Sequence, residues 1–274
     1  MKIIKVKNMN ISIKIFTEDK FIGLKRYETL ESPKYFIESK DNIDFILDDN
    51  KLSSKMKFYE LYKYDNYIIQ KQINEKGNVI GYIKYSKNYV YLYPLNISFE
   101  LEYLLSQYAL VYFLRLENDS LFMHGSSLRY LNKGIIFTAK SGTGKSTHTR
   151  LWMKLSDAVT INDDKNIIAL EGNDLVIYSS PWSGKEMRDN NIKSKLDVIV
   201  FLYQNKENKV EELNGRGALK LLLHQIETIN DTNKDIWNKI VDRMLELPIL
   251  YYGCNMEDDA FYTIKKELEK YGIK

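Results

Sequence analysis

The sequence is poor in cysteine, histidine and proline: its 274 residues include one cysteine, three histidines and four prolines. The single cysteine, Cys254, excludes an internal disulfide and a thiolate metal cluster, and this usage fits a reducing compartment. The net charge is only +3, because 40 basic side chains nearly balance 37 acidic ones. The composition therefore gives no indication of a nucleic-acid partner.

Long hydrophobic runs are also missing. The most apolar stretch, Leu104–Leu116, is interrupted by Ser106, Gln107 and Arg115 and is too short and too polar to cross a bilayer. A signal peptide has an apolar core after its basic residues, and no such core follows the basic residues at the amino end of this sequence. We therefore expect a cytoplasmic protein without a membrane partner, and the sequence leaves open whether the chain forms a homo-oligomer.

The first part of the chain is rich in short Ile, Tyr and Phe runs separated by polar turns. Ile11–Phe16, Tyr67–Gln72 and Ile80–Tyr93 have the composition of strands. Within the last of these runs, Ile83–Tyr93 predicts a hairpin that turns at 86–88. We predict a smaller, mainly antiparallel β domain over residues 1–97, with one or two short helices. The many tyrosines of this domain could form a partner-binding face. Tyrosine is also a common residue in β-strands, and we favour this second explanation.

Residues 98–274 show a different pattern, in which strands and helices alternate. Ser98–Leu116 carries apolar residues at helical spacing, and we assign 98–118 to a helix that connects the two domains. We expect 127–131 to be the hairpin partner of 121–123. The alternation of strands and helices over 98–274 predicts an α/β domain. Together with the mainly β first domain, the whole chain is expected to be α+β. The other expected strands are 134–138, 159–161, 166–170, 175–178, 198–202 and 249–252, and the other expected helices are 145–155, 217–229, 235–245 and 258–270.

The most informative segment, which we call the glycine loop, runs from Ala139 to Ser146 and reads Ala-Lys-Ser-Gly-Thr-Gly-Lys-Ser. It fits the pattern Gly-x-x-x-x-Gly-Lys-Ser/Thr, except that alanine replaces the first glycine, and a strand and a helix are expected on either side. In such a loop, main-chain N–H groups and the start of the helix hold nucleotide phosphates. Lys145 would lie on the terminal phosphates and the Ser146 hydroxyl would bind Mg²⁺, whereas a chance match in a flexible loop is the alternative. The expected nucleotide-binding residues are Ser141, Gly142, Thr143, Gly144, Lys145, Ser146 and Thr147.

Two aspartates, Asp163 and Asp164, follow the expected strand 159–161 and lie 18 and 19 residues after Lys145. This gap holds one helix and a short connection, as a parallel strand–helix–strand crossover requires. The carboxyl ends of both strands would then meet at one edge of the sheet, beside the glycine loop. One carboxylate would accept the proton of an attacking hydroxyl and the other would hold Mg²⁺, for which Asp164 and Ser146 are the expected ligands. An Asp-Asp pair is also a common turn at a strand end.

Two further positions are candidates for the same edge. His124 ends a strand and precedes Gly125, so it would point towards the glycine loop; a structural histidine is the alternative. Lys185 follows Pro-Trp-Ser-Gly and would neutralise charge on the transferred phosphoryl group, with Trp182 covering the site; an ordinary loop lysine fits equally well. The candidate catalytic residues are Asp163, Asp164, His124 and Lys185.

These motifs, in this order, resemble the HPr kinase/phosphorylase family, whose nucleotide core is shared with phosphoenolpyruvate carboxykinase. The matching segments are 124–125, 141–146 and 162–165, and the stretches 146–152 and 181–185 are similar to those of the HPr-kinase-related group. The resemblance covers about residues 121–255. It implies an HPr kinase and carboxykinase-like P-loop core, with ATP and Mg²⁺ as cofactors and a peptide serine or a small hydroxyl compound as acceptor.

The resemblance also implies roles for single residues. Lys145 and Ser146 match the phosphate- and Mg²⁺-binding positions, and His124 matches the active-site histidine. One residue of the Asp163–Asp164 pair matches the catalytic carboxylate, and the other matches a metal ligand. The sequence departs from the family at the first loop glycine and shows no counterpart of the family's later arginine-bearing loop. The reverse phosphorylase reaction and HPr itself as substrate are therefore not implied.

The leading hypothesis is a Mg·ATP-dependent kinase that transfers a phosphoryl group to a hydroxyl, with serine of a peptide or protein as the acceptor. A small molecule such as free serine is the alternative acceptor. A second hypothesis is not an enzyme but a nucleotide-binding regulatory module. In this module, ATP would order the first half of the chain so that it binds a partner, and no phosphoryl group would be transferred. A carboxykinase-like enzyme ranks last, because the sequence offers no convincing second metal site or anion clamp.

Overall fold

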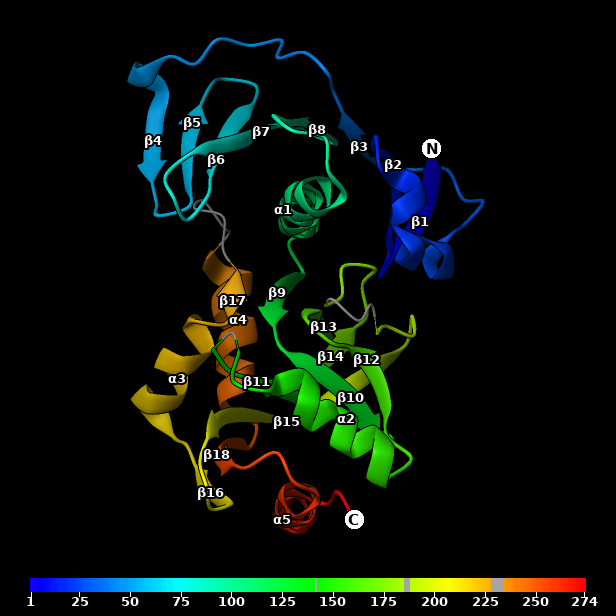
Figure 1. The fold of residues 1–274 in the computed structure, drawn as a ribbon, viewed down its shortest axis with the longest axis vertical. Coiled ribbons are helices and arrows are strands. Elements are labelled where there is room, and N and C mark those ends of the chain that lie inside the picture. Colours follow the sequence, from blue (N-terminus) through cyan, green and yellow to red (C-terminus); the bar gives the residue numbers. More distant parts are fainter. Residues whose placement is uncertain (141, 185–187, 228–233) are drawn as a thin grey trace. The chain divides into compact units, whose positions relative to one another are not determined.

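The structure is a computed structural model that describes residues 1–140, 142–184, 188–227 and 234–274. Its contacts divide the chain into two compact units, residues 1–116 and 117–274, and each unit is built on one large sheet. Figure 1 shows the helices and strands of both units, coloured along the chain. The fold is therefore a mixed α/β fold with two large sheets and few helices.

The first unit is a mainly antiparallel sheet accompanied by one long helix. The strand order is β1-β2-β3-β8-β7-β6-β5-β4, and only the β2–β3 and β3–β8 pairs are parallel. The expected hairpin is present, with Ser86 paired to Tyr89 across its turn. The elements are β1 (Lys2–Val6), β2 (Met9–Lys14), η1 (Glu18–Lys20), η2 (Ile22–Tyr27), β3 (Tyr35–Ser39), η3 (Asp49–Lys51), β4 (Leu52–Lys55), β5 (Tyr59–Lys63), β6 (Ile68–Ile73), β7 (Val79–Ser86), β8 (Tyr89–Pro94) and α1 (Phe99–Glu117).

Helix α1 belongs to the first unit, so the division of the chain falls at 116/117 and not at the expected 97/98. The reason is aromatic packing between the helix and the strands: Tyr35 stacks on Phe113 with ring centroids 4.5 Å apart, and Tyr85 contacts Tyr112 at 4.8 Å. In the described part of the chain, no helix combines the length and the apolar character needed to cross a membrane.

A buried carboxylate, that of Glu102, fastens α1 to this unit. It accepts hydrogen bonds from the N–H groups of Phe16 (3.0 Å) and Thr17 (2.7 Å), and from the hydroxyls of Thr17 and Ser39. We predict that Glu102→Ala lowers the free energy of unfolding by about 3 kcal/mol, because these donors lose their acceptor. Urea unfolding measures the change. The exposed Glu100→Ala serves as control, and an equal loss in both variants would contradict the prediction.

The second unit carries the strand–helix alternation. Its main strand order is β12-β10-β11-β15-β14-β13-β9-β17, and β18 pairs with β15 and β16. The long strand β15 pairs with β14 through its first residues and with β11 and β18 further along. The elements are β9 (Ser120–His124), β10 (Ser126–Tyr130), β11 (Lys133–Thr138), α2 (Lys145–Leu155), β12 (Val159–Asn162), β13 (Lys165–Glu171), β14 (Asp174–Tyr178), β15 (Lys193–Gln204), β16 (Lys209–Glu212), α3 (Gly215–Leu223), β17 (Ile226–Glu227), α4 (Lys234–Leu245), β18 (Ile249–Cys254), α5 (Asp258–Leu268) and η4 (Glu269–Tyr271).

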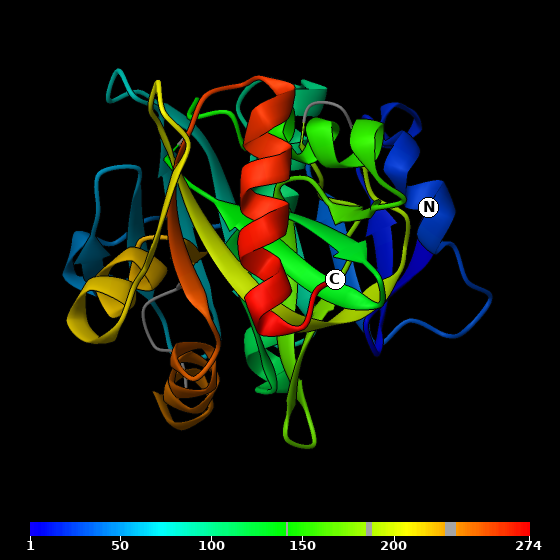
Figure 2. The same cartoon turned by 90° about the horizontal axis from the view of Figure 1, so that it is seen from below.

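Helices cover both faces of the parallel core β11-β15-β18. Trp152 of α2 and Phe261 of α5 belong to the same buried cluster as Phe137 and Val200. A second buried cluster lies on the opposite face of the sheet and contains side chains of α3 and α4. Along the strands, the residues of this cluster alternate with those of the first cluster. Figure 2 shows α5 crossing one face of the sheet. This layering leaves the carboxyl ends of the parallel strands open at one edge.

The expected hairpin of 121–123 with 127–131 is wrong. Strand β10 instead turns back into β11, through Leu131 and Asn132 with φ of 49° and 61°, as a type I′ hairpin turn requires. Strand β9 pairs with β13 and β17. The single residue Gly125 between β9 and β10 is too short for a hairpin turn, so the two strands part.

Strand β10 also changes the expected crossover. Strands β11 and β12 run in the same direction, as predicted, but β10 lies between them and is antiparallel to both. Their carboxyl ends still lie at one edge of the sheet. The expected helix 217–229 is only partly present: α3 ends at Leu223, and 226–227 form β17 because they pair with the edge of β9, where His124 N–H donates to Gln225 O. Residues 228 and 229 lie outside the described part.

Candidate functional site

The glycine loop connects β11 to α2 and needs glycine at two positions. Gly142 and Gly144 have φ of 79° and 109°, a conformation that other residues rarely adopt. An added Cβ at Gly144 would also lie 2.4 Å from Met256 Cε. Ala139, at the place of the missing first glycine, is buried in the core below the loop. Ser141 lies outside the described residues.

Lys145 is the first residue of α2, and its side chain is buried. Its Nζ donates to the carbonyl of Ala139 at 3.2 Å. Burial lowers the pKa of Lys145, although the nearby Asp164 carboxylate acts in the opposite direction. Ser146 and Thr147 follow in the first helical turn and are half-buried. The start of α2 therefore presents a cation, two hydroxyls and the N–H groups of a helix end, which is a set that suits an anion.

His124 and Asp164 meet at this edge. The Nε2 of His124 lies 2.9 Å from Oδ1 of Asp164, and about a quarter of each side chain is exposed. The main chain reinforces the contact, because Gly125 N–H donates to Asp164 O and the Thr138 hydroxyl donates to His124 O. Burial raises the pKa of Asp164, but the hydrogen bond from His124 and the charges of Lys165 and Lys145 outweigh it and hold the pKa below its ordinary value. Asp164 is therefore ionised at neutral pH.

Asp163 has a different environment from its neighbour. Its side chain is buried and accepts a hydrogen bond from Gly184 N–H. Burial raises the pKa of Asp163 to about 6, despite the lowering effect of that hydrogen bond and with a further rise from Asp164. Asp163 thus anchors the segment around Gly184, whereas Asp164 faces His124 and Lys145.

Trp182, in the described part of the segment after β14, does not form the expected cover over the site. Trp182 is fully buried, and the amide of Asn162 donates to the carbonyls of Ser180 (2.8 Å) and Trp182 (3.3 Å). The ring belongs to the interior because this network pulls the segment against the end of β12. The prediction for Trp182 is therefore wrong. Lys185, the fourth candidate catalytic residue, lies outside the described part of the chain.

His148 lies behind the loop in α2, buried between Phe137 and Tyr252. Neither ring nitrogen has a hydrogen-bond partner among the described residues, and burial lowers the pKa to about 4. Because histidine in the unfolded chain titrates near 6.5, protonation favours unfolding, and stability is lost as the pH falls from about 6.5 towards 4. We predict that His148→Phe removes this loss, which is on the order of 3 kcal/mol.

Urea unfolding between pH 7 and pH 4 measures this dependence. The exposed His224→Phe is the matched control and should keep the wild-type profile. A His148→Phe variant that loses as much stability as the wild type over this range would contradict the prediction.

The donor set at the loop fits Mg²⁺ only in partnership with a bound nucleotide. No group of three or more His, Cys, Asp or Glu side chains that could hold a metal gathers within the described ranges. Ser146 and Asp164 are the two oxygen donors expected from the sequence, and Mg²⁺ is usually held by one or two carboxylates together with substrate phosphates and water. These two residues therefore suit an ion that arrives with phosphates.

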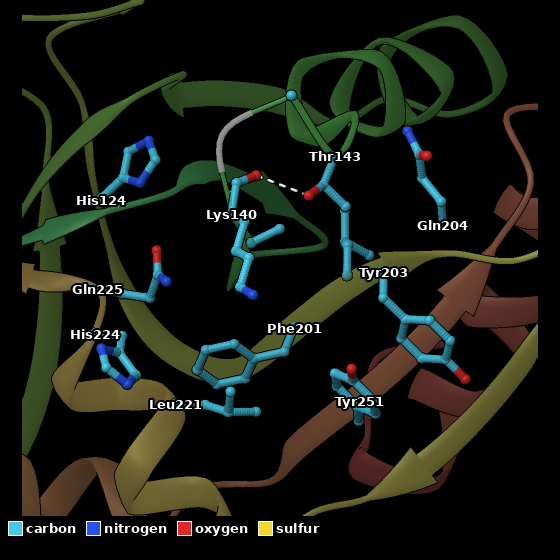
Figure 3. A pocket seen from close by; sticks show the side chains of 13 residues that line it. His124, Lys140, Thr143, Phe201, Tyr203, Gln204, Leu221, His224, Gln225 and Tyr251 are labelled. Atoms are coloured by element: carbon cyan, nitrogen blue, oxygen red, sulfur yellow. Dashed lines mark hydrogen bonds between the residues drawn. The ribbon is translucent and has the colours of Figure 1, made fainter. Parts of the chain in front are cut away.

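A cavity of about 920 Å³ lies beside the glycine loop and was not anticipated from the sequence. Figure 3 shows His124 on one side of it, Tyr203 and Tyr251 on the other, and the side chain of Lys140 pointing into it. The described lining residues are His124, Ala139, Lys140, Gly142, Thr143, Phe201, Leu202, Tyr203, Gln204, Leu221, His224, Gln225 and Tyr251. One observation could have predicted a cavity here: β15 and β18 are parallel to β11, so all three strands end at the same edge of the sheet.

Together these features define a mixed α/β protein with a candidate anion-binding edge. Among solved structures, the chain is similar to the Hpr(Ser) kinase/phosphatase from Coxiella burnetii, at 11% sequence identity and a TM-score of 0.32. The match covers 54% of this chain and 98% of that chain. No protein-family model matches the sequence, and no curated protein matches it. This similarity is weak.

Proposed function

We propose that this protein is a Mg²⁺- and ATP-dependent kinase that transfers a phosphoryl group to a hydroxyl, with serine of a peptide or protein as the acceptor. The observation that carries the proposal is the 2.9 Å contact between His124 and Asp164, next to Lys145 at the start of α2. Phosphoryl transfer requires mainly positioning and charge neutralisation, and these residues offer a base and a cation at the mouth of an anion-binding loop.

Nucleotide binding would be the task of the loop and the start of α2. The N–H groups of 142–147 would donate to phosphate oxygens, and Lys145 would leave the Ala139 carbonyl to contact the terminal phosphates. Ser146, together with phosphate oxygens and water, would hold Mg²⁺ near these phosphates, where the ion would neutralise charge on the nucleotide. Asp164, the other expected ligand, is assigned to proton transfer instead.

Transfer would depend on Asp164. Its carboxylate takes the proton of the acceptor hydroxyl while the hydroxyl oxygen forms a bond to the γ-phosphorus. The bond between that phosphorus and the β–γ bridging oxygen breaks, and ADP leaves with the electron pair. His124 donates to Asp164 Oδ1 and orients the carboxylate. Lys145 stabilises the charge on the transferred group.

The acceptor is proposed from the order of motifs, which resembles that of kinases acting on serine hydroxyls. A small molecule such as free serine remains the second candidate within the same chemistry. The partly exposed His124 and Asp164 leave the base open to either kind of acceptor.

Incubation with ATP labelled at the γ-phosphate tests the activity. We expect label on a serine-containing peptide or protein, or on free serine, to appear with the wild-type chain and Mg²⁺ and to disappear when Mg²⁺ is chelated. Label found only in free phosphate, or nowhere beyond ATP, would refute the kinase and favour a nucleotide-binding regulatory module.

A further inference from the structure

The cavity beside the glycine loop has an aromatic wall built by two parallel strands. Strand β15 pairs Phe201 with Tyr251 and Tyr203 with Gly253 of β18, so these side chains share one face of the sheet. Tyr203 stacks on Tyr251 with ring centroids 4.4 Å apart and an interplanar angle of 23°. The wall therefore presents flat rings next to the loop.

Gly253 makes this wall possible. A Cβ at this position would lie 2.4 Å from the ring of Tyr203, which real side chains do not tolerate. Only glycine lets the Tyr203 ring lie flat against β18 beside Tyr251. Both tyrosines remain partly exposed, so their rings are reachable from the cavity. Aromatic faces of this kind bind flat, uncharged ring systems by stacking.

The position of the cavity relative to β11 suits the base and ribose of a nucleotide better than the hydroxyl acceptor. Asp163 and Asp164 follow β12, on one side of β11, whereas the aromatic wall belongs to β15 and β18 on the other side. A nucleotide with its last phosphate at Lys145 and Asp164 has to extend its sugar and base away from the carboxylates. That direction leads past the loop to the tyrosines. The hydroxyl acceptor, in contrast, has to reach Asp164.

We propose that this cavity binds the base and ribose of the nucleotide, with the base stacked on the Tyr203–Tyr251 wall. The inference rests on nucleotide binding as set out under the proposed function. The volume of about 920 Å³ lies within the range of small-molecule sites and accommodates a nucleoside. Lys140, whose side chain points into the cavity, stands between the wall and the loop and would face the phosphate nearest the ribose (Figure 3). The ligand class is a purine nucleotide, because a purine offers the larger stacking area.

Calorimetric titration of the 274-residue chain with MgATP and with magnesium tripolyphosphate tests this assignment, because tripolyphosphate lacks base and ribose. Tyr251→Ala should weaken ATP about tenfold and leave tripolyphosphate within about twofold of the wild type. Leu221→Trp, which fills the cavity from α3, should have the same selective effect. Tyr262→Ala, on the exposed face of α5, is the matched control and should change neither affinity.

Retained tripolyphosphate binding also demonstrates that each variant is folded at the loop. Unchanged ATP affinity in both cavity variants would overturn the inference, as would equal losses for the two ligands. An unchanged ATP affinity with a raised KM for the acceptor would assign the cavity to the acceptor instead. Selective loss of ATP binding in a chain that transfers no phosphate would support the base site while refuting the kinase.

Discussion

Asp164→Asn is expected to reduce phosphoryl transfer about a thousandfold while MgATP remains bound, since general bases contribute on this scale. The asparagine oxygen can still accept the hydrogen bond from His124, so the geometry of the pair is retained. What the variant lacks is a group that takes a proton at neutral pH. The ionised state of Asp164 in the wild type follows from its lowered pKa. Single-turnover assays with labelled ATP, together with calorimetric titration of MgATP, measure the two effects separately.

The same variant separates the two roles considered for Asp164. If Asp164 is the general base, added Mg²⁺ cannot take over its role. The loss of transfer rate in Asp164→Asn should then persist at every Mg²⁺ concentration. Rescue of the rate by high Mg²⁺ would assign Asp164 to the metal instead. Asp174→Asn, at an exposed ion pair with Lys195, is the charge-matched control and should transfer phosphate at the wild-type rate.

Lys145→Ala is expected to lower kcat/KM for ATP by about a thousandfold or more, because the proposed mechanism has this residue contact both the bound phosphates and the transferred group. Its folding stability should not fall. The folded protein keeps this ammonium buried and lowers its pKa, so the charge contributes unfavourably to folding at neutral pH. Loss of activity with an unchanged or raised melting temperature would therefore identify a functional lysine.

Lys154→Ala provides the matched control within the same helix. Lys154 is exposed and pairs with Asp258, and its loss should leave ATP turnover unchanged. If Lys145→Ala turns ATP over like the wild type, or if both variants fall alike, the glycine loop is not a phosphate site.

Part of the candidate site could be predicted because it is encoded locally. Gly142 and Gly144 stand at the positive φ angles of the loop, and Lys145 begins the helix at the predicted residue. His124 and Asp164, more distant in sequence, were expected at the same edge and lie 2.9 Å apart. Strand direction was enough for Asp164, because β12 runs in the same direction as β11. It was not enough for His124, because β9 pairs antiparallel with β13 and β17.

The separate roles of the two aspartates could not be predicted. Adjacent residues of a chain carry the same pattern signal, yet Asp163 is buried against Gly184 and Asp164 faces His124. Burial depends on which segments fold over each side chain, and here it raises the pKa of Asp163 to about 6 while the pKa of Asp164 is lowered. The buried position of Trp182 has the same origin.

The sequence by itself determined the local elements: the alternating strands and helices of the second half, the glycine loop and the start of α2. These follow from side-chain periodicity and from glycines at positive φ, which act over a few residues. Only the tertiary structure decided that β10 lies between β11 and β12, that α1 packs with the first unit, and that Tyr203 and Tyr251 form a wall beside the loop. These features depend on contacts between segments far apart in the chain, and their free energy comes from burial and pairing that no local pattern records.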